Sequence, residues 1–240
     1  MSRPSDTCPE YCSDLRFEAS YLKSPVWRLN DVSFASDAVK SAIENDVALI
    51  SARIFSNELR FVKKLMLSGF YKVETLITLE RAISGEPKAI SGVRIATQKD
   101  ADAAAKIASS SFNFDRFHAD PNISNDIADQ IKSGWARNAI LGRADSVLVV
   151  ENNGNVLGFN ACLLRENAAI IDLIAIEASM QGKGYGKRLI DAMAYHYKDK
   201  VKVLRLGTQE TNKQSIKFYK KLGFKVVERH DTYHWVPNAI

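Results

Sequence analysis

The sequence has few of the residues that mark the more specialised protein classes. Among 240 residues there are only three cysteines, six prolines and twelve glycines. This composition excludes a disulfide-dense scaffold, a collagen-like repeat and a Pro/Gly-rich disordered chain. Apolar runs such as residues 147–150 fall far short of the roughly 20 residues that cross a bilayer. We therefore expect a globular protein that is not inserted in a membrane.

Charge of one sign is not concentrated anywhere. The 33 lysines and arginines exceed the 28 acids, but they form no basic block of the nucleic-acid-binding type. We expect no nucleic-acid partner, and a small anionic ligand suffices to account for the excess. Cys8, Cys12 and Cys162 have neither disulfide nor zinc spacing and are expected to be reduced thiols. The first twenty residues lack the apolar stretch of a signal peptide, which predicts a cytoplasmic protein.

Chain breakers around residue 90 predict two units, 1–90 and 91–240. In the larger unit, Thr97 and Asp100 predict a capping box before a helix, and a second helix is expected over 125–141 after an irregular segment. Strands are then expected at 146–151 and 156–163, on either side of an Asn153-Gly154 turn, and at 168–176. The remainder predicts a helix after residue 184, a strand over 203–208, a helix over 212–222 that ends at Gly223, and final strands over 224–235.

The two units end alike. Residues 57–74 and 212–228 both read as a helix, a Gly-Phe pair and a strand. This echo predicts that the first unit is a reduced version of the second, packed beside it.

The segment with the most specific chemistry is Gln181-Gly182-Lys183-Gly184-Tyr185-Gly186-Lys187, between a strand and a helix. It is not a Rossmann fingerprint, because Lys187 stands where the third glycine is required. It is not a P-loop, because Lys187 is followed by Arg188 instead of serine or threonine. What remains is Gln-x-x-Gly-x-Gly at a helix start, where backbone amides and the helix dipole favour an anion such as pyrophosphate. A plain glycine-rich turn is the alternative.

With Leu173-Ile174-Ala175-Ile176 before it, this loop resembles the motif of the GCN5-related N-acetyltransferase (GNAT) family, over residues 93–235. The resemblance implies an α/β (α+β) fold with a mixed central sheet, with acetyl-CoA as cosubstrate and no metal. It implies that the CoA pyrophosphate is held by Gln181, Gly182, Lys183, Gly184, Tyr185, Gly186 and Lys187. Ile174 and Ile176 would pair their backbone with the pantetheine arm, and Asn212 would contact CoA. Tyr219 would lie near the thioester sulfur as general acid.

Within that family, residues 114–118, 135–139, 204–209 and 67–74 are similar to enzymes that acetylate dTDP-4-amino-4,6-dideoxygalactose and carry a degenerate N-terminal acetyltransferase-like half. This similarity implies a nucleotide-linked amino sugar as substrate, in surface polysaccharide biosynthesis. It implies Glu74 as the base, and Arg116 and His118 as substrate contacts.

Each of these roles has a structural alternative. Glu74 could be a solvated surface acid, Arg116 and His118 ordinary surface residues, and Tyr219 a core aromatic. His230 and His234 are not expected to bind a metal, because their four-residue spacing does not converge on a strand.

Two other functions stay open. One is an acetyltransferase for a protein N-terminus or a small amine, and the other is a non-catalytic CoA-binding scaffold. Tyr219 together with Asn212 argues against the scaffold, and the companion unit with Arg116 argues mildly against a peptide substrate. A homodimer is left open.

Overall fold

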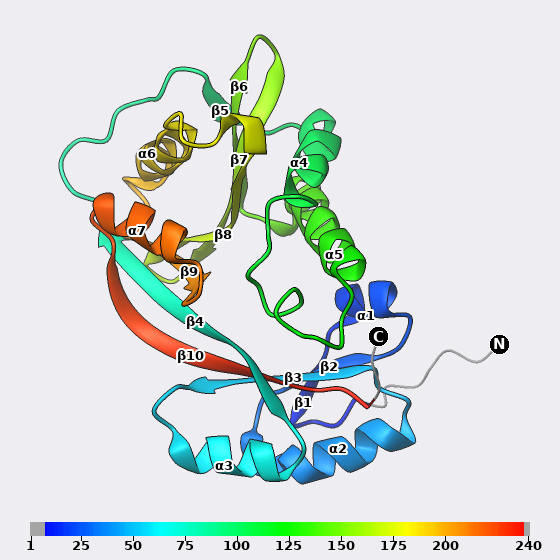
Figure 1. Cartoon of the computed structure of the whole chain (residues 1–240). Helices are drawn as coiled ribbons and strands as arrows, with labels where there is room; N and C mark the ends of the chain where they lie inside the picture. Colours follow the sequence, from blue (N-terminus) through cyan, green and yellow to red (C-terminus); the bar gives the residue numbers. More distant parts are fainter. Residues whose placement is uncertain (1–7, 238–240) are drawn as a thin grey trace.

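The computed structural model describes residues 8–237 (Figure 1), and its ten strands form one mixed sheet in the order β1-β2-β3-β10-β4-β9-β8-β7-β6-β5. The pairs β2/β3 and β8/β9 are parallel, and the other neighbours are antiparallel. The strands are β1 (Cys12–Asp14), β2 (Val26–Leu29), β3 (Leu49–Phe55), β4 (Tyr71–Ala82), β5 (Val93–Ile95), β6 (Ser146–Asn152), β7 (Asn155–Arg165), β8 (Ala168–Ile176), β9 (Val203–Gln209) and β10 (Lys225–Trp235). A mixed α/β fold is confirmed.

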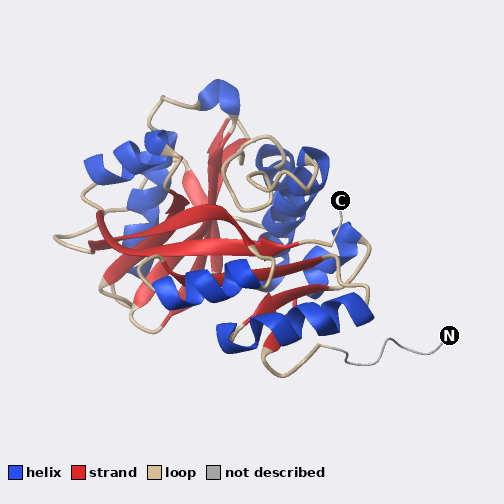
Figure 2. Cartoon of the chain, turned by 60° about the horizontal axis from the view of Figure 1, so that its bottom comes forward, coloured by secondary structure: helices blue, strands red, loops and turns tan. Residues whose placement is uncertain are grey.

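Helices cover both faces of this sheet (Figures 1 and 2). The helices are α1 (Arg16–Leu22), α2 (Ala35–Glu44), α3 (Leu59–Leu67), α4 (Ala101–Ala108), α5 (Asn125–Asn138), α6 (Tyr185–Tyr197) and α7 (Lys213–Lys221). The first face carries α2 and α3 over one apolar cluster and α6 and α7 over another. Helices α1, α4 and α5 pack on the opposite face. None of the helices between residues 8 and 237 combines the length and apolar character that a bilayer-spanning helix needs.

Local signals place most elements of the C-terminal half. Thr97 and Asp100 form the expected capping box before α4, and the Asn153-Gly154 turn joins β6 to β7. Gly223 ends α7 with a φ of 85°, a conformation that glycine adopts without steric cost. The helix expected over 125–141 ends earlier, at Asn138, because the chain widens into a π-type turn in which Gly142 has a φ of 119°.

The centre of the sheet is built by an exchange of strands between the two halves. Strand β4, from the first ninety residues, lies between β9 and β10, and β10 lies between β3 and β4. Ile77 and Leu79 of β4 therefore join the core beneath α6, whereas Tyr233 and Trp235 of β10 join the core beneath α2. The halves are joined through the sheet rather than merely packed beside each other. The expected boundary falls in the connector between β4 and β5, and the division into two domains stays a prediction.

The exchange corrects the expectation of several strands over 224–235. This segment is a single strand, β10, because neither glycine nor proline interrupts it, and its neighbours come from the first half of the chain.

The segments α3–β4 and α7–β10 are arranged symmetrically. Gly69 and Gly223 end their helices with φ values of 86° and 85°. Leu76 and His230, each seven residues after its glycine, face each other in the antiparallel register. The pairing of β4 with β10 is therefore centred on equivalent residues, and the two segments are related by an approximate two-fold axis.

Candidate functional site

The glycine loop lies at one wall of a cleft of about 700 Å³. Strand β8 leads into the loop, and α6 begins at Tyr185. Most of the residues expected to contact acetyl-CoA line this cleft, namely Ile174, Ile176, Gln181, Gly182, Gly184, Tyr185, Gly186, Asn212 and Tyr219. Lys183 and Lys187 are not among the lining residues. The ammonium of Lys187 pairs with Asp191, and that of Lys183 lies 3.4 Å from the sulfur of Met180.

The loop has the backbone that an anion requires. Gly182 and Gly184 have φ values of 75° and 85°, and a Cβ at either position would meet no atom within 4 Å. Glycine is therefore favoured at these two positions by the positive φ, and not because a larger side chain would clash with its surroundings. No side chain caps the N-terminus of α6, so its first amides have no side-chain acceptor. The loop fits the pyrophosphate of acetyl-CoA.

Strands β8 and β9 separate beside this loop. Their parallel pairing ends at Ile171 and Leu206, although β8 continues to Ile176 along its other neighbour, β7. The divergence exposes the edge of the second part of β8 to the cleft, which Ile174 and Ile176 line. Unpaired strand edges offer backbone donors and acceptors to an extended ligand.

Tyr219 is both a core aromatic and a cleft residue. Its ring contacts Phe218 and Phe224, and the residue is buried. Burial raises the pKa of its hydroxyl, which keeps the proton in place at neutral pH. Asn212 caps α7, because its side-chain oxygen accepts a hydrogen bond from the Ser215 amide at 3.1 Å.

Several cleft residues carry no signal that sequence reasoning used. Phe218 precedes Tyr219 on α7, and Ser110, Ser111, Asn113 and Phe114 come from the segment after α4. Irregular segments have no periodicity from which their facing side chains can be read.

Glu74 lies in the middle of the sheet rather than at a strand end. It is the fourth residue of the twelve-residue strand β4, and its side chain is 4% exposed. One carboxylate oxygen accepts hydrogen bonds from Arg53 at 3.2 Å and Thr232 at 3.1 Å. The other accepts one from Gln209 at 3.0 Å. Since a carboxylate has about four acceptor positions, roughly one is left for a ligand.

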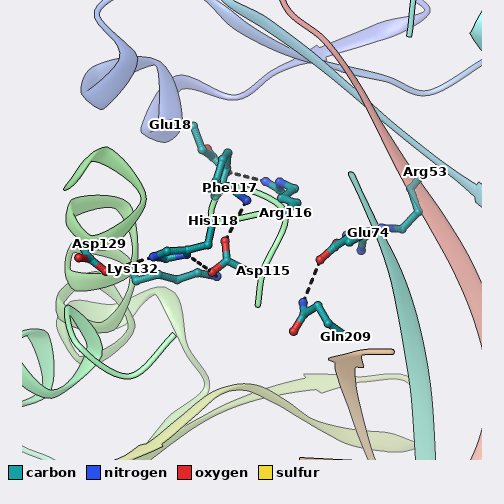
Figure 3. A network of polar contacts seen from close by, with 10 residues as sticks. All are labelled: Glu18, Arg53, Glu74, Asp115, Arg116, Phe117, His118, Asp129, Lys132 and Gln209. Carbon is teal, nitrogen blue, oxygen red and sulfur yellow. Dashed lines mark hydrogen bonds and ion pairs between the residues drawn. The ribbon is translucent and has the colours of Figure 1, made fainter. Parts of the chain in front are cut away.

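Arg116 and His118 are inside the protein, opposite Glu74 (Figure 3). The Arg116 guanidinium, with a side chain 10% exposed, lies 3.2 Å from Glu18 and 4.5 Å above the Phe117 ring. Its Nε is buried and has no hydrogen-bond partner. Burial, followed by the charge of Arg53, lowers the pKa of Arg116 to about 10.

His118 is held by acids on both sides. Its Nδ1 lies 2.6 Å from Asp115 and its Nε2 lies 3.1 Å from Asp129. Burial lowers the pKa of His118, but the bonds and charges of these acids outweigh it and the net pKa is raised. Lys132 lies 3.6 Å from Asp115 in the same cluster, and burial lowers its pKa. Both ring nitrogens of His118 are thus engaged within the protein, and its contact with substrate stays a prediction.

The two histidines of β10 have different environments. His234 is fully buried and lies 2.7 Å from Asp120, whereas the His230 ring packs against Phe55. No cluster of three or more metal-ligating side chains was found between residues 8 and 237.

A hollow of about 860 Å³ beneath the 83–92 connector is larger than the glycine-loop cleft. Its charged lining residues include both signs: Glu80, Arg81, Glu86, Lys88, Asp191 and Lys225. It lies away from the glycine loop and contains none of the expected site residues, so size alone does not identify the site.

Comparison with known proteins agrees with the acetyl-CoA cleft inferred from this geometry. Residues 109–224 match the Acetyltransferase (GNAT) family. The chain is 32% identical over 139 residues to the spore coat polysaccharide biosynthesis protein SpsD of Bacillus subtilis, covering 58% of this chain and 48% of that protein. It is 35% identical over 93 residues to the [Ribosomal protein bS18]-alanine N-acetyltransferase of Haemophilus influenzae, covering 38% of this chain and 62% of that protein. The aligned regions thus span about half the length of these curated relatives.

Solved structures share the fold over most of the chain. A GCN5-related N-acetyltransferase from Sphaerobacter thermophilus superposes with a TM-score of 0.63 at 13% identity, over 95% of this chain and 76% of that one. A tandem GNAT protein from the clavulanic acid biosynthesis pathway gives a TM-score of 0.62 at 12% identity, over 89% and 75%. At such identities the likeness is one of fold. The family match over residues 109–224, together with the glycine loop at the start of α6, identifies the C-terminal part of this chain as a GNAT acetyltransferase domain.

Proposed function

We propose that the protein transfers the acetyl group of acetyl-CoA to the amino group of a nucleotide-linked amino-deoxysugar of the dTDP-4-amino-4,6-dideoxyhexose type. The observation that carries the proposal is the position of Glu74. Strand β4 brings this carboxylate from the N-terminal half to the neighbouring strand β9, where Gln209 binds it. The similarity to a spore coat polysaccharide protein supports a sugar acceptor and a role in surface polysaccharide biosynthesis.

Direct transfer to an amine has three chemical requirements: a neutral amine, a polarised thioester carbonyl and a proton for the departing thiolate. Glu74 meets the first, because its remaining acceptor position receives the ammonium and then its proton, directly or through water. The backbone N–H near Ile176 meets the second by donating to the carbonyl oxygen. The nitrogen then bonds to the carbonyl carbon and the carbon–sulfur bond breaks.

Tyr219 meets the third requirement. It lines the same cleft as the glycine loop, and burial keeps its hydroxyl protonated. A protonated phenol can give its proton to the CoA thiolate as the thiolate leaves. The glycine loop and the edge of β8 hold the cosubstrate so that the thioester reaches this hydroxyl.

The test is a CoA-release assay with acetyl-CoA and a panel of nucleotide 4-amino sugars, peptides with free N-termini and polyamines. We expect the highest kcat/KM for a nucleotide amino sugar. A higher value for a peptide would favour protein N-terminal acetylation, the activity named for the H. influenzae relative. Acetyl-CoA binding without turnover on any acceptor class would favour a scaffold.

A further inference from the structure

The N-terminal half contains a second, smaller pocket, of about 220 Å³, which we call the arginine pocket. Its lining residues are Arg28, Leu29, Asn30, Ser51, Arg53 and Arg116. Arg28 lies beside Ser51 in the β2/β3 register, so these two side chains and Arg53 share one face of the sheet. Arg116 reaches the same pocket from the segment between α4 and α5. Three guanidinium groups therefore meet around one small volume.

The positive charge of the arginine pocket is only partly compensated. Glu18 pairs with Arg116 and Glu74 pairs with Arg53, each at 3.2 Å. No hydrogen bond or ion pair joins the Arg28 guanidinium to any residue in the described part of the chain, 8–237, and Arg28 is exposed. The buried Nε of Arg116 has no partner either. Since a buried donor without an acceptor is costly, this arrangement favours an anion that supplies acceptors.

The arginine pocket occupies the place in the N-terminal half that the cofactor cleft occupies in the C-terminal half. The parallel pairing of β2 with β3 ends at Leu29 and Ala52, as that of β8 with β9 ends at Ile171 and Leu206. No glycine loop follows β2, because residues 30–34 contain no glycine. The N-terminal half therefore lacks a glycine loop that could hold the pyrophosphate of acetyl-CoA. Arginine side chains lie instead at the point where β2 and β3 separate.

We propose that the arginine pocket binds the phosphate-bearing part of the acceptor while the amino group lies at Glu74, an inference that rests on the proposed function. A guanidinium group can donate two parallel hydrogen bonds to two oxygens of one phosphate, a geometry that an ammonium group lacks. The volume of about 220 Å³ lies below the range for a whole drug-sized ligand, so the pocket suits a charged group with the remainder of the molecule outside. Arg53 links the two positions, because it lines the pocket and binds Glu74.

The first test measures binding of dTDP and of inorganic pyrophosphate by calorimetry, with CoA at saturation so that the glycine loop is occupied. Arg28→Gln is the informative variant, because Arg28 is exposed and its replacement leaves the described contacts of the pocket intact. We expect at least tenfold weaker binding of both anions, with Arg28→Lys in between. Arg60→Gln, which removes an exposed charge from α3, is the matched control and should leave binding unchanged.

The second test separates the source of the phosphate. With a nucleotide amino sugar, Arg28→Gln should raise KM about tenfold with little change in kcat, the pattern of an interaction made equally in ground and transition states. With the free amino sugar, KM should be unchanged by the substitution. Inorganic pyrophosphate should compete with the nucleotide sugar in the wild type and lose this effect in Arg28→Gln.

Failure of this inference differs from failure of the proposed function. Anion binding that is the same in Arg28→Gln and wild type would overturn the arginine pocket as a phosphate site, even if nucleotide sugars are acetylated. If peptides prove the better acceptors while pyrophosphate binding still depends on Arg28, the proposed acceptor is wrong and the pocket stands as a phosphate site.

Discussion

The segments α3–β4 and α7–β10 share the same fold but differ in the side chains at equivalent positions. In each, the amide of the phenylalanine after the glycine bonds to a carbonyl five residues earlier, on Leu65 or Tyr219. The C-terminal segment thus has a phenol where the N-terminal one has a fully buried leucine. Asn212 caps its helix, whereas its counterpart Glu58 makes no cap. Helix termination and core packing are thus shared by the two copies, whereas the side chains proposed to act on acetyl-CoA occur in one copy only.

The reverse holds for the acids of the two strands. Glu74 and Glu228 each lie five residues after the glycine, yet Glu74 is buried among hydrogen-bond donors and Glu228 is exposed. In the proposed mechanism the acid, Glu74, comes from one copy and the phenol, Tyr219, comes from the other. This division yields four predictions, ordered by expected size.

Tyr219→Phe should have the largest effect, a decrease in kcat of about 10²–10⁴-fold with little change in acetyl-CoA affinity, because only the hydroxyl is lost. Steady-state kinetics and calorimetry measure the two quantities. Tyr195→Phe removes a hydroxyl from an exposed position on α6 and should leave kcat near wild type. Equal kcat values in wild type and Tyr219→Phe would mean that another group or a water protonates the thiolate.

Glu74→Gln should lower kcat/KM on the order of 10²-fold, at the low end of general acid–base effects. The loss should be greatest at low pH, where the amine is protonated and must give up a proton. A pH–rate profile checks this, with Glu228→Gln as the matched control from the other copy. Identical profiles for the two variants would remove Glu74 from the mechanism.

Gly184→Val should weaken acetyl-CoA binding about tenfold or more, because a β-branched residue at a φ of 85° carries strain of roughly 1–3 kcal/mol and displaces the loop amides. Gly154→Val introduces similar strain at the β6/β7 turn, where φ is 78°. That control should cost stability without changing affinity in calorimetry. Unchanged affinity in a folded Gly184→Val variant would contradict the loop assignment.

His118→Gln should have the smallest effect, on stability rather than on binding. The pKa of His118 is raised in the folded protein, so its contribution is complete below the unfolded pKa and is lost as pH rises through the folded pKa. The variant should therefore lose more unfolding free energy at pH 5.5 than at pH 9, where about 1 kcal/mol remains from the neutral hydrogen bonds. Denaturant titrations at both pH values measure the difference. A larger loss at pH 9 would show that His118 is not held as a cation.

Sequence reasoning recovered the features that local signals determine. The Asn153-Gly154 turn, the Thr97 capping box and the glycine that ends α7 each depend on a few adjacent residues, and each was found in place. The strand exchange was not predicted, because the pairing of β4 with β9 joins residues more than 120 positions apart. Periodicity within a segment carries no information about its neighbours in a sheet.

Burial of charged groups was missed for a related reason. Glu74 and Arg116 were weighed as surface residues, since charged side chains are almost never fully buried unless paired. Their partners, Arg53, Gln209 and Glu18, come from β3, β9 and α1, which are distant in the sequence. Arg28 was not singled out at all, because a lone arginine on a short strand carries no local pattern.

The exchange of strands also determines when the core of the N-terminal half can form during protein synthesis. The core beneath α2 includes Tyr233 and Trp235, so the half that leaves the ribosome first lacks two of its aromatic side chains until the end of β10 has been made. Translation adds about 5–20 residues each second, and about 150 residues separate the end of β4 from the end of β10, so the N-terminal apolar surface stays open for about 8–30 s. A nascent chain arrested near residue 200 would thus present β3 and β4 with unpaired edges, ready to pair with another chain or to be held by a chaperone.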